Sequence, residues 1–157
     1  ETLDCDELIR DVTRLAEAEA RVRDIEIEID PQVGLPAVSV DAVQIQQVVL
    51  NLLRNGMDAM QSIACRSGNT IGIRTRLSDD GGVEVAVIDR GSGVPDDVTE
   101  MLFSPFATTK KSGMGMGLSI SRAIVTAHGG SLNFRNNSDG GATFFFTLPL
   151  AEQGDTP

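Results

Sequence analysis

The stretch that decides the fold of this chain runs from residue 48 to residue 58 and reads Val48-Val49-Leu50-Asn51-Leu52-Leu53-Arg54-Asn55-Gly56-Met57-Asp58. On one helix from residue 43 to residue 65, at about 100° per residue, a narrow face carries only polar side chains. This polar stripe consists of Gln44, Gln47, Asn51, Asn55 and Asp58. The remaining circumference is apolar, which predicts a largely buried helix. Because an unsatisfied buried amide costs about 1–3 kcal/mol, the stripe needs a partner, and a ligand with its ion is one candidate.

The composition fits one domain and excludes several functional classes. The 157 residues are 41% hydrophobic, which is enough for a single core but leaves no room for a second domain of similar size. The net charge of −10 argues against nucleic-acid binding, which needs clustered Lys and Arg. The single histidine, His128, excludes a multi-histidine metal site. Cys5 and Cys65 have no metal-type spacing, so we expect two ordinary reduced thiols.

The sequence carries no sign of a membrane segment. No apolar run approaches the roughly 18 residues that span a bilayer, and the first residues lack the basic and apolar parts of a signal peptide. No basic patch that could contact a lipid surface is present either. We therefore expect a cytoplasmic domain without direct membrane contact, which includes the cytoplasmic part of a membrane-bound protein.

The residues ahead of the polar stripe predict one helix and two extended pieces. Apolar side chains recur at helical spacing over residues 4–23. Ile25, Ile27 and Ile29 then alternate with acidic residues, which is the period of a half-buried strand. Residues 37–40 form a shorter extended piece, and Asp41 stands where the N-cap of the long helix belongs.

The residues after the polar stripe predict two β-hairpins and two further helices. The expected hairpin strands are residues 71–77 with 83–89, and residues 131–135 with 142–148. The expected helices are residues 96–102 and 118–128, and residues 151–157 form a polar tail. This order favours an α/β (α+β) two-layer sandwich, in which three main helices pack on one face of a mixed, mostly antiparallel sheet.

Three glycine clusters stand apart from ordinary turn glycines. They are Gly91-Ser92-Gly93, Gly113-Met114-Gly115-Met116-Gly117, and Gly140-Gly141. The middle cluster leads into a helix, and the backbone N–H groups at a helix N-terminus favour a phosphate. It is not a Walker A sequence, because no Gly-Lys-Ser/Thr follows, and its glycine spacing does not fit a dinucleotide-binding fingerprint.

Five features occur in a characteristic order: the Asn51/Asn55 helix, Asp89-x-Gly91-x-Gly93, Phe103-x-x-Phe106 with the Thr-Thr-Lys run, the second glycine cluster, and Gly141-Ala142-Thr143-Phe144. This order and spacing resemble the ATP-binding, catalytic domain of two-component sensor histidine kinases, in the GHKL superfamily. The resemblance covers nearly all of the chain. It implies a GHKL-type ATP-binding fold for residues 1–150, with an ATP lid at about residues 96–114.

The resemblance also implies a role for each matching residue. Asn55 matches the asparagine that coordinates the Mg²⁺ bridging the ATP phosphates, and an amide oxygen is a reasonable Mg²⁺ ligand. Asp89 matches the carboxylate that accepts a hydrogen bond from the adenine amino group. Satisfied packing amides and a turn-forming aspartate are the alternatives. The other nucleotide contacts that the resemblance implies are Asn51, Asp58, Gly91, Gly93, Thr108, Thr109, Lys110, Gly113, Gly115, Met116, Gly117, Leu118 and Thr143.

Two residues bear on the reaction. Lys110 is the best candidate for a lid contact with the phosphates, with solvated surface charge as the alternative. In hydrolysing members of the superfamily, a glutamate one helical turn before the metal asparagine activates water as a general base. Asn51 occupies that position here, so we expect a site that holds ATP for phosphoryl transfer and hydrolyses it poorly.

The resemblance implies partners that this chain does not contain. His128 matches a structural position, so the phosphoacceptor histidine is expected on the dimerisation helices of a parent kinase, with relay to a response regulator. We expect the fragment to be a monomer that is inactive alone and the parent to be a homodimer. Two alternatives stay open: a GHKL-type serine kinase or anti-sigma-like module, and a nucleotide-binding docking scaffold without activity.

Overall fold

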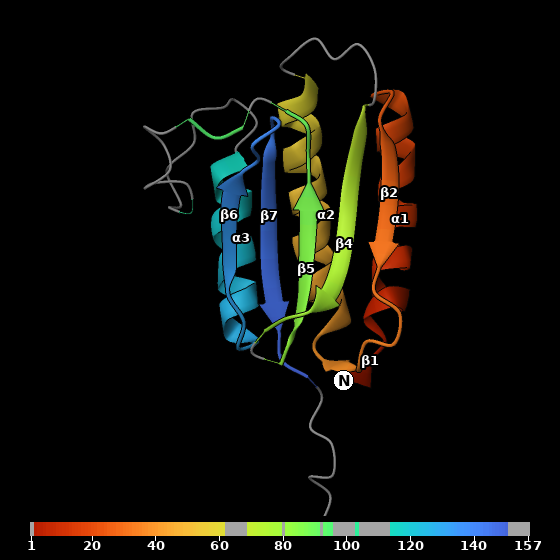
Figure 1. Cartoon of the computed structure of the whole chain (residues 1–157), viewed down its shortest axis with the longest axis vertical. Helices are drawn as coiled ribbons and strands as arrows, with labels where there is room; N and C mark the ends of the chain where they lie inside the picture. The colour runs from red at the N-terminus through yellow and green to blue at the C-terminus, as the bar shows by residue number, and fades with distance from the viewer. Residues whose placement is uncertain are drawn as a thin grey trace, which may run out of the picture.

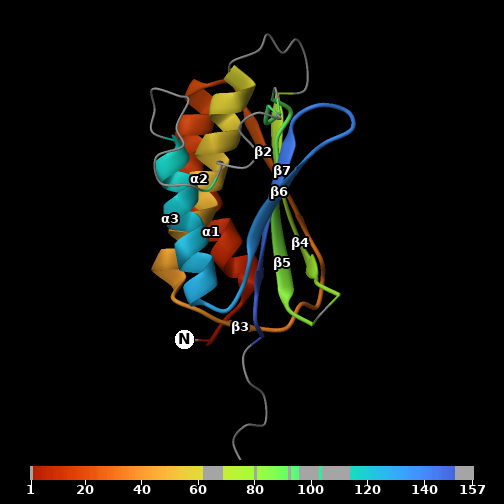
Figure 2. The same ribbon diagram turned by 90° about the vertical axis from the view of Figure 1, so that its left-hand side faces the viewer.

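The computed structural model has two layers, a five-stranded sheet and three helices that cover one of its faces (Figures 1 and 2). It describes residues 2–61, 69–79, 81–91, 93–95, 103 and 114–150. The expected helix at residues 96–102, most of the expected lid and the polar tail lie outside these residues. The two-layer sandwich with a mixed, mostly antiparallel sheet is confirmed.

The large sheet has the strand order β2-β4-β5-β7-β6. Its strands are β2 (Glu26–Pro31), β4 (Thr70–Leu77), β5 (Val83–Ile88), β6 (Leu132–Asn136) and β7 (Ala142–Leu148). Only β2 and β4 pair in parallel, and the other neighbours are antiparallel. Both expected hairpins are therefore confirmed. A small second sheet pairs β1 (Thr2–Leu3) with β3 (Val38–Ser39), which the sequence patterns did not predict.

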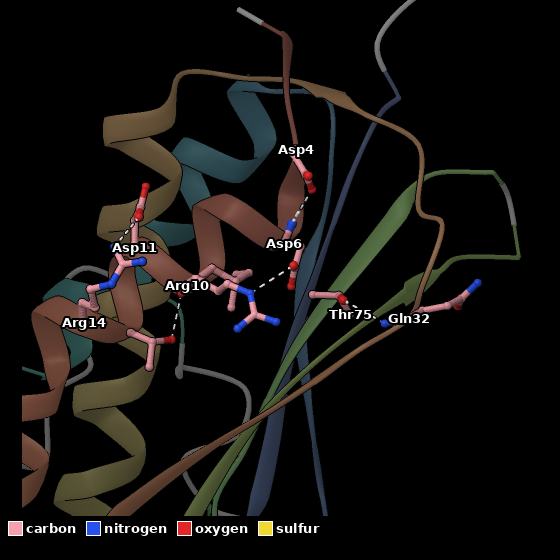
Figure 3. Close-up of polar contacts among 9 residues, drawn as sticks. Asp4, Asp6, Arg10, Asp11, Arg14, Gln32 and Thr75 are labelled. Atoms are coloured by element: carbon pink, nitrogen blue, oxygen red, sulfur yellow. Dashed lines mark hydrogen bonds and ion pairs between the residues drawn. The ribbon is translucent and has the colours of Figure 1, made fainter.

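Helix α1 (Cys5–Val22) has Asp4 as its N-cap. The Asp4 Oδ1 accepts a hydrogen bond from the Asp6 N–H at 3.0 Å, which satisfies one of the free donors of the first turn (Figure 3). On the exposed side, Arg10 pairs with Asp6 and Arg14 with Asp11 (Figure 3). Such exposed pairs contribute little to stability, so the apolar face of α1 holds it on the sheet.

Helix α2 (Ala42–Gln61) lies between α1 and α3 and forms the centre of the core. Its apolar side chains Ile45, Val48, Val49, Leu52, Leu53 and Met57 are fully buried. The Asp41 Oδ1 accepts from the Gln44 N–H at 3.0 Å, as expected of the N-cap. Helix α3 (Met114–Ala127) begins four residues earlier than predicted, so its first turn contains Gly115 and Gly117. None of the helices that the structure describes could cross a membrane.

His128 joins the C-terminal end of α3 to the N-terminal end of α2. Its Nε2 accepts a hydrogen bond from the Asp41 N–H at 3.1 Å, so the neutral ring carries its proton on Nδ1. That Nδ1 lies 2.8 Å from the Ile124 carbonyl oxygen and donates to it. Both ring nitrogens are therefore occupied by structural contacts.

We expect His128→Ala to lower the free energy of unfolding by about 1–3 kcal/mol, because the Asp41 N–H loses its acceptor and two hydrogen bonds disappear. Urea unfolding measures this change. Thr126→Ala, at an exposed position of the same helix, is the control and should shift the value by less than about 0.5 kcal/mol. Equal stability of the two variants would contradict a structural role for His128.

Candidate functional site

Asp89 follows β5 directly and is the best-anchored polar side chain at this end of the sheet. Its Oδ1 accepts hydrogen bonds from the Gly91 N–H at 2.8 Å and from the Ala142 N–H at 3.2 Å. The residue is only 2% exposed. Burial raises the pKa of the carboxyl group above its ordinary value, while the two N–H donors act in the opposite direction. The result is a buried carboxylate in one fixed orientation.

Two glycines, which have no side chain, let α2 approach Asp89 closely. A Cβ at Gly56 of α2 would lie 2.5 Å from the Ile71 Cδ1 and 3.1 Å from the Asp89 Cβ. A Cβ at Gly91 would lie 2.7 Å from the backbone carbonyl carbon of Ala59. The helix and the loop after β5 therefore pack almost backbone to backbone. This contact places Asn55, the residue before Gly56, next to the Asp89 end of the sheet.

The structure separates the members of the polar stripe. The Asn51 Nδ2 donates to the Ser121 Oγ of α3 at 3.2 Å, and Gly117 of α3 also approaches the Asn51 amide. Asn55, one turn further along, is 9% exposed. Its side chain has no hydrogen bond to any residue that the structure describes. Gln44 and Gln47 are exposed.

Asp58 has a partner on a different helix from that of Asn51. Its Oδ1 lies 2.7 Å from the Arg23 Nη1, and Arg23 also contacts Glu19 of α1 at 2.8 Å. Arg54 completes this group with a 3.1 Å contact to Glu19. Seven residues, or about 700°, separate Asn51 from Asp58, so both start from nearly the same line along α2. Two turns of helix separate them along its axis, and there Asn51 contacts α3 while Asp58 contacts α1.

Thr143 lies on the other side of the sheet from the helices. Its register partners are Ile88 of β5 and Arg135 of β6, and its hydroxyl donates to the Asn137 Oδ1 at 2.6 Å. Side chains alternate between the two faces of a strand, so the side chain of the neighbouring Ala142 lies on the helix side. The Ala142 N–H is the one that donates to the Asp89 carboxylate. The alternation of side chains in β7 could have identified Ala142 as the residue on the helix side, whereas the motif resemblance assigned a nucleotide contact to Thr143 only.

Two further residues hold this end together: Asn137, which the sequence patterns did not single out, and Gly141 of the third glycine cluster. The Asn137 Nδ2 donates to the Asp89 carbonyl oxygen at 3.2 Å, so it holds the backbone of the buried carboxylate. Gly141 has φ +85°, and a Cβ there would collide with the Asp89 carbonyl oxygen. Both belong to the turn between β6 and β7, which no sequence pattern connects to Asp89.

The structure gives only partial information on the expected lid and the second glycine cluster. Thr108, Thr109, Lys110 and Gly113 lie outside the described residues, as do the side-chain surroundings of Gly115 and Met116. Leu118 is buried in the core, and Gly93 has φ +79° beside the Asn136 side chain. The Phe103 ring packs against Phe134 and Phe144, with centroids 6.5 Å apart in each case. Phe103 thus packs against the core, and Phe106 lies outside the described residues.

Comparison with known proteins decides the family. The model of the family described as histidine kinase-, DNA gyrase B-, and HSP90-like ATPase matches residues 40–152. The chain belongs to this family. Its GHKL fold and the resemblance found in its motifs are thereby confirmed.

Relatives of this GHKL domain include several sensor kinases. The sensor protein FixL of Bradyrhizobium diazoefficiens is 45% identical over 93% of the chain, and the sensor histidine kinase ZraS of Escherichia coli is 31% identical over 96%. The domain spans only 28% of FixL and 31% of ZraS. The catalytic domain of histidine kinase ThkA superposes with a TM-score of 0.80 at 33% identity, over 95% of this chain and 94% of that one.

We expect Asp89→Asn to change how stability depends on pH. Because burial raises the pKa of Asp89, the folded domain binds this proton more tightly than the unfolded chain does. Its contribution to stability is therefore present at low pH and is lost as the pH rises through the folded-state pKa. The asparagine keeps an Oδ1 acceptor for the Gly91 and Ala142 N–H groups but cannot ionise. The free energy of unfolding of this variant should therefore not fall with rising pH in the way that Asp89 makes that of the wild type fall. Urea unfolding over a pH series tests this, and a wild type that gains stability relative to Asp89→Asn with rising pH would contradict it.

Proposed function

We propose that this domain binds Mg·ATP between α2, α3 and the Asp89 end of the sheet, and that it supplies the γ-phosphoryl group to a histidine outside this chain. The phosphoacceptor would lie on the dimerisation helices of a parent sensor kinase, and a response regulator would receive the group afterwards. The parent would act as a cytoplasmic or membrane-anchored homodimer, while the isolated domain would be a monomer.

The single observation that carries this proposal is the state of Asn55. The residue is 9% exposed and its side chain has no hydrogen bond within the described part of the chain, while the next residue, Gly56, packs against Asp89. The amide oxygen and nitrogen of Asn55 are not among the buried unpaired atoms of the described residues, so they reach the surface. An unpaired amide that is accessible at the edge of the core is available to a bound ligand, which supports a ligand site at Asn55.

Asn55 also fits Mg²⁺ by its chemistry. Among the described residues no cluster of His, Cys, Asp or Glu could hold a metal ion alone. Mg²⁺ often takes only one or two protein oxygens and completes its shell with substrate phosphates and water. The Asn55 amide oxygen would be the protein ligand of this kind. When bound, the ion would neutralise charge on the phosphates during transfer.

Asp89 suits the adenine amino group. A carboxylate only accepts hydrogen bonds, so it selects for a ligand that donates one. The Gly91 and Ala142 N–H groups hold its orientation before any ligand arrives, which lowers the entropic cost of binding. Gly93, with its positive φ, would let the chain turn closely around the base.

The start of α3 and the lid would hold the phosphates. Helix α3 begins at Met114, so Gly115, Met116 and Gly117 belong to its first turn and Leu118 follows directly. Backbone N–H groups there favour an anion through hydrogen bonds and the helix dipole. From the lid, we propose that Lys110 contacts the phosphates, supported by Thr108, Thr109 and Gly113. Their roles rest on the resemblance of the motifs.

The site favours phosphoryl transfer over hydrolysis. Asn51 occupies the position of the hydrolytic glutamate, and a neutral amide cannot take a proton from water. The Asn51 Nδ2 is also engaged with Ser121. Phosphoryl transfer needs mainly positioning and charge stabilisation, which the remaining groups can provide. His128 is held by Asp41 and Ile124, so it is not the acceptor in this proposal.

Two related structures, each determined as a complex, support the assignment. Full-length ShkA, in complex with AMPPNP, superposes with a TM-score of 0.83 at 28% identity, over 98% of this chain and 31% of ShkA. ThkA in complex with the response regulator protein TrrA superposes with a TM-score of 0.78 at 31% identity, over 96% of this chain and 42% of ThkA. A nucleotide analogue and a response regulator thus bind proteins that contain this fold.

Replacing Asn55 should remove the metal-dependent part of nucleotide binding. We expect Asn55→Ala to weaken ADP binding about tenfold or more in the presence of Mg²⁺, because the amide oxygen ligand is lost, and to change binding little without Mg²⁺. Calorimetry with and without Mg²⁺ measures both values. Gln47→Ala, an exposed change on the same helix, is the control. A folded wild-type domain that binds no nucleotide would sink the proposal.

The acceptor can be identified by the stability of the phosphorylated product. We expect the domain, mixed with labelled ATP and the histidine-containing helical hairpin of a related sensor kinase, to form an acid-labile, alkali-stable product. Asn55→Ala should lower the yield of phosphorylated hairpin at least about tenfold, because the variant lacks the amide oxygen that would bind Mg²⁺. An acid-stable product on a serine substrate, with none on the hairpin, would instead favour the serine-kinase alternative.

A further inference from the structure

The face of the sheet that the helices leave uncovered carries a cavity of about 450 Å³. Figure 2 shows the loop between β6 and β7 extending from the sheet on the side away from the helices. Strand β4 contributes Arg74 to the cavity, β5 contributes Ile88, β7 contributes Thr143, and β6 contributes Arg135 and Asn136. Ile88, Thr143 and Arg135 are neighbours in one row of the sheet. The cavity is therefore separate from the proposed nucleotide site on the helix side.

The cavity is positively charged in an acidic protein. The residues that line the cavity include two arginines, Arg74 and Arg135, and one carboxylate, that of Asp139, whereas the whole chain has a net charge of −10. Neither arginine forms an ion pair in the part of the chain that the structure describes. Arg76, two residues further along β4 on the same face, is instead paired with Glu84 at 2.8 Å. The sheet thus neutralises one of its exposed arginines and leaves the two in the cavity.

Arg74 has unused hydrogen-bonding capacity. Its Nε is buried and has no hydrogen-bond acceptor among the described residues, while the side chain as a whole is half-buried. Its register partner on β2 is Asp30, but the two form no ion pair. The Arg135 guanidinium lies 5.2 Å from the centre of the Phe145 ring, which limits its freedom. A planar guanidinium with free donors matches the two oxygens of a carboxylate or phosphate.

Two residues that line the cavity form hydrogen bonds with the segment that begins at Asp89. The Asn136 Oδ1 accepts from the Val94 N–H at 2.8 Å, and its Nδ2 donates to the Val94 carbonyl oxygen at 3.0 Å. Asn137, which also lines the cavity, donates to the Asp89 carbonyl oxygen and accepts from Thr143. Any ligand that holds the β6–β7 turn in place therefore also holds both ends of residues 89–94.

We propose that this cavity is a second ligand site, which binds a small molecule through a phosphate or carboxylate group, and that its occupation strengthens nucleotide binding. The volume lies within the range of small-molecule sites. The second clause rests on the proposed function, because it assumes that Asp89 contacts the nucleotide. The coupling would arise because a ligand that has already ordered the β6–β7 turn reduces the conformational entropy that nucleotide binding must still cost.

Oxyanion binding is tested first, without nucleotide or metal. The domain is titrated with inorganic pyrophosphate and, separately, with succinate, and backbone amide NMR shifts are followed. We expect saturable shifts centred on residues 135–143 for at least one probe, and the two arms distinguish phosphate from carboxylate chemistry. Arg74→Gln and Arg135→Gln should each weaken binding about tenfold, as expected when a charged hydrogen bond is lost. Arg76→Gln, whose arginine is already paired, should bind like the wild type.

Two results would overturn the site: no saturable shift at residues 135–143 with either probe, or binding by Arg74→Gln and Arg135→Gln equal to that of the wild type. Thermal unfolding of each variant, followed by circular dichroism, establishes that a loss of binding does not come from a loss of fold. Because either arginine variant alone tests the cavity, a folding defect in one leaves the other as a valid test.

The coupling is tested by measuring ADP affinity with and without the probe that binds. We expect the probe to tighten ADP binding about fivefold, the lower end of typical allosteric coupling, in the wild type and in Arg76→Gln but not in Arg74→Gln. Unchanged ADP affinity with the probe bound would overturn the coupling. A domain that binds the oxyanion but no ADP would overturn the proposed function and the coupling with it, while the cavity site would stand.

Discussion

The contact between α2 and the end of β5 is the constraint on which the rest of the structure depends. It requires glycine at position 91, where a Cβ would overlap the Ala59 backbone, and favours glycine at position 56, where a Cβ would crowd the Ile71 side chain and lie 3.1 Å from the Asp89 Cβ. It also places the Asp89 carboxylate in a buried position, where the Gly91 and Ala142 N–H groups offset part of the cost of losing water. Once this contact forms, the height and rotation of α2 relative to the sheet are determined, and with them the position of Asn55.

The neighbours of α2 then divide its polar stripe. Helix α3 takes Asn51 through Ser121, and α1 takes Asp58 through Arg23. The Arg23–Asp58 pair is partly buried, with side chains 20% and 28% exposed, so it fixes the helix more firmly than the exposed pairs elsewhere on α1. Asn55 is the buried member whose side chain has no hydrogen bond among the described residues. Its availability for a ligand thus results from which of its neighbours are already satisfied.

The turn between β6 and β7 joins the two faces of the sheet. Gly141 and Asn137 pack against or bond to the Asp89 backbone, while Asn136 and Asn137 line the cavity on the uncovered face. The same few residues thus support the carboxylate that we assign to adenine and the wall of the arginine cavity. Because the same short turn contributes to both sites, a ligand that orders the turn from one face would also affect the position of the groups on the other face.

The sequence by itself determined the local elements and the order of the motifs. Both hairpins and the N-cap of α2 follow from periodicity and turn residues, which act over a few positions. The family resemblance follows from the order and spacing of the motifs. Only the tertiary structure decided that β2 pairs in parallel with β4, that Asp58 faces Arg23, that Thr143 lies opposite the helices, and that Arg74 and Arg135 share a cavity. These features depend on residues far apart in the chain, whose encounter is set by packing and register and leaves no periodic pattern.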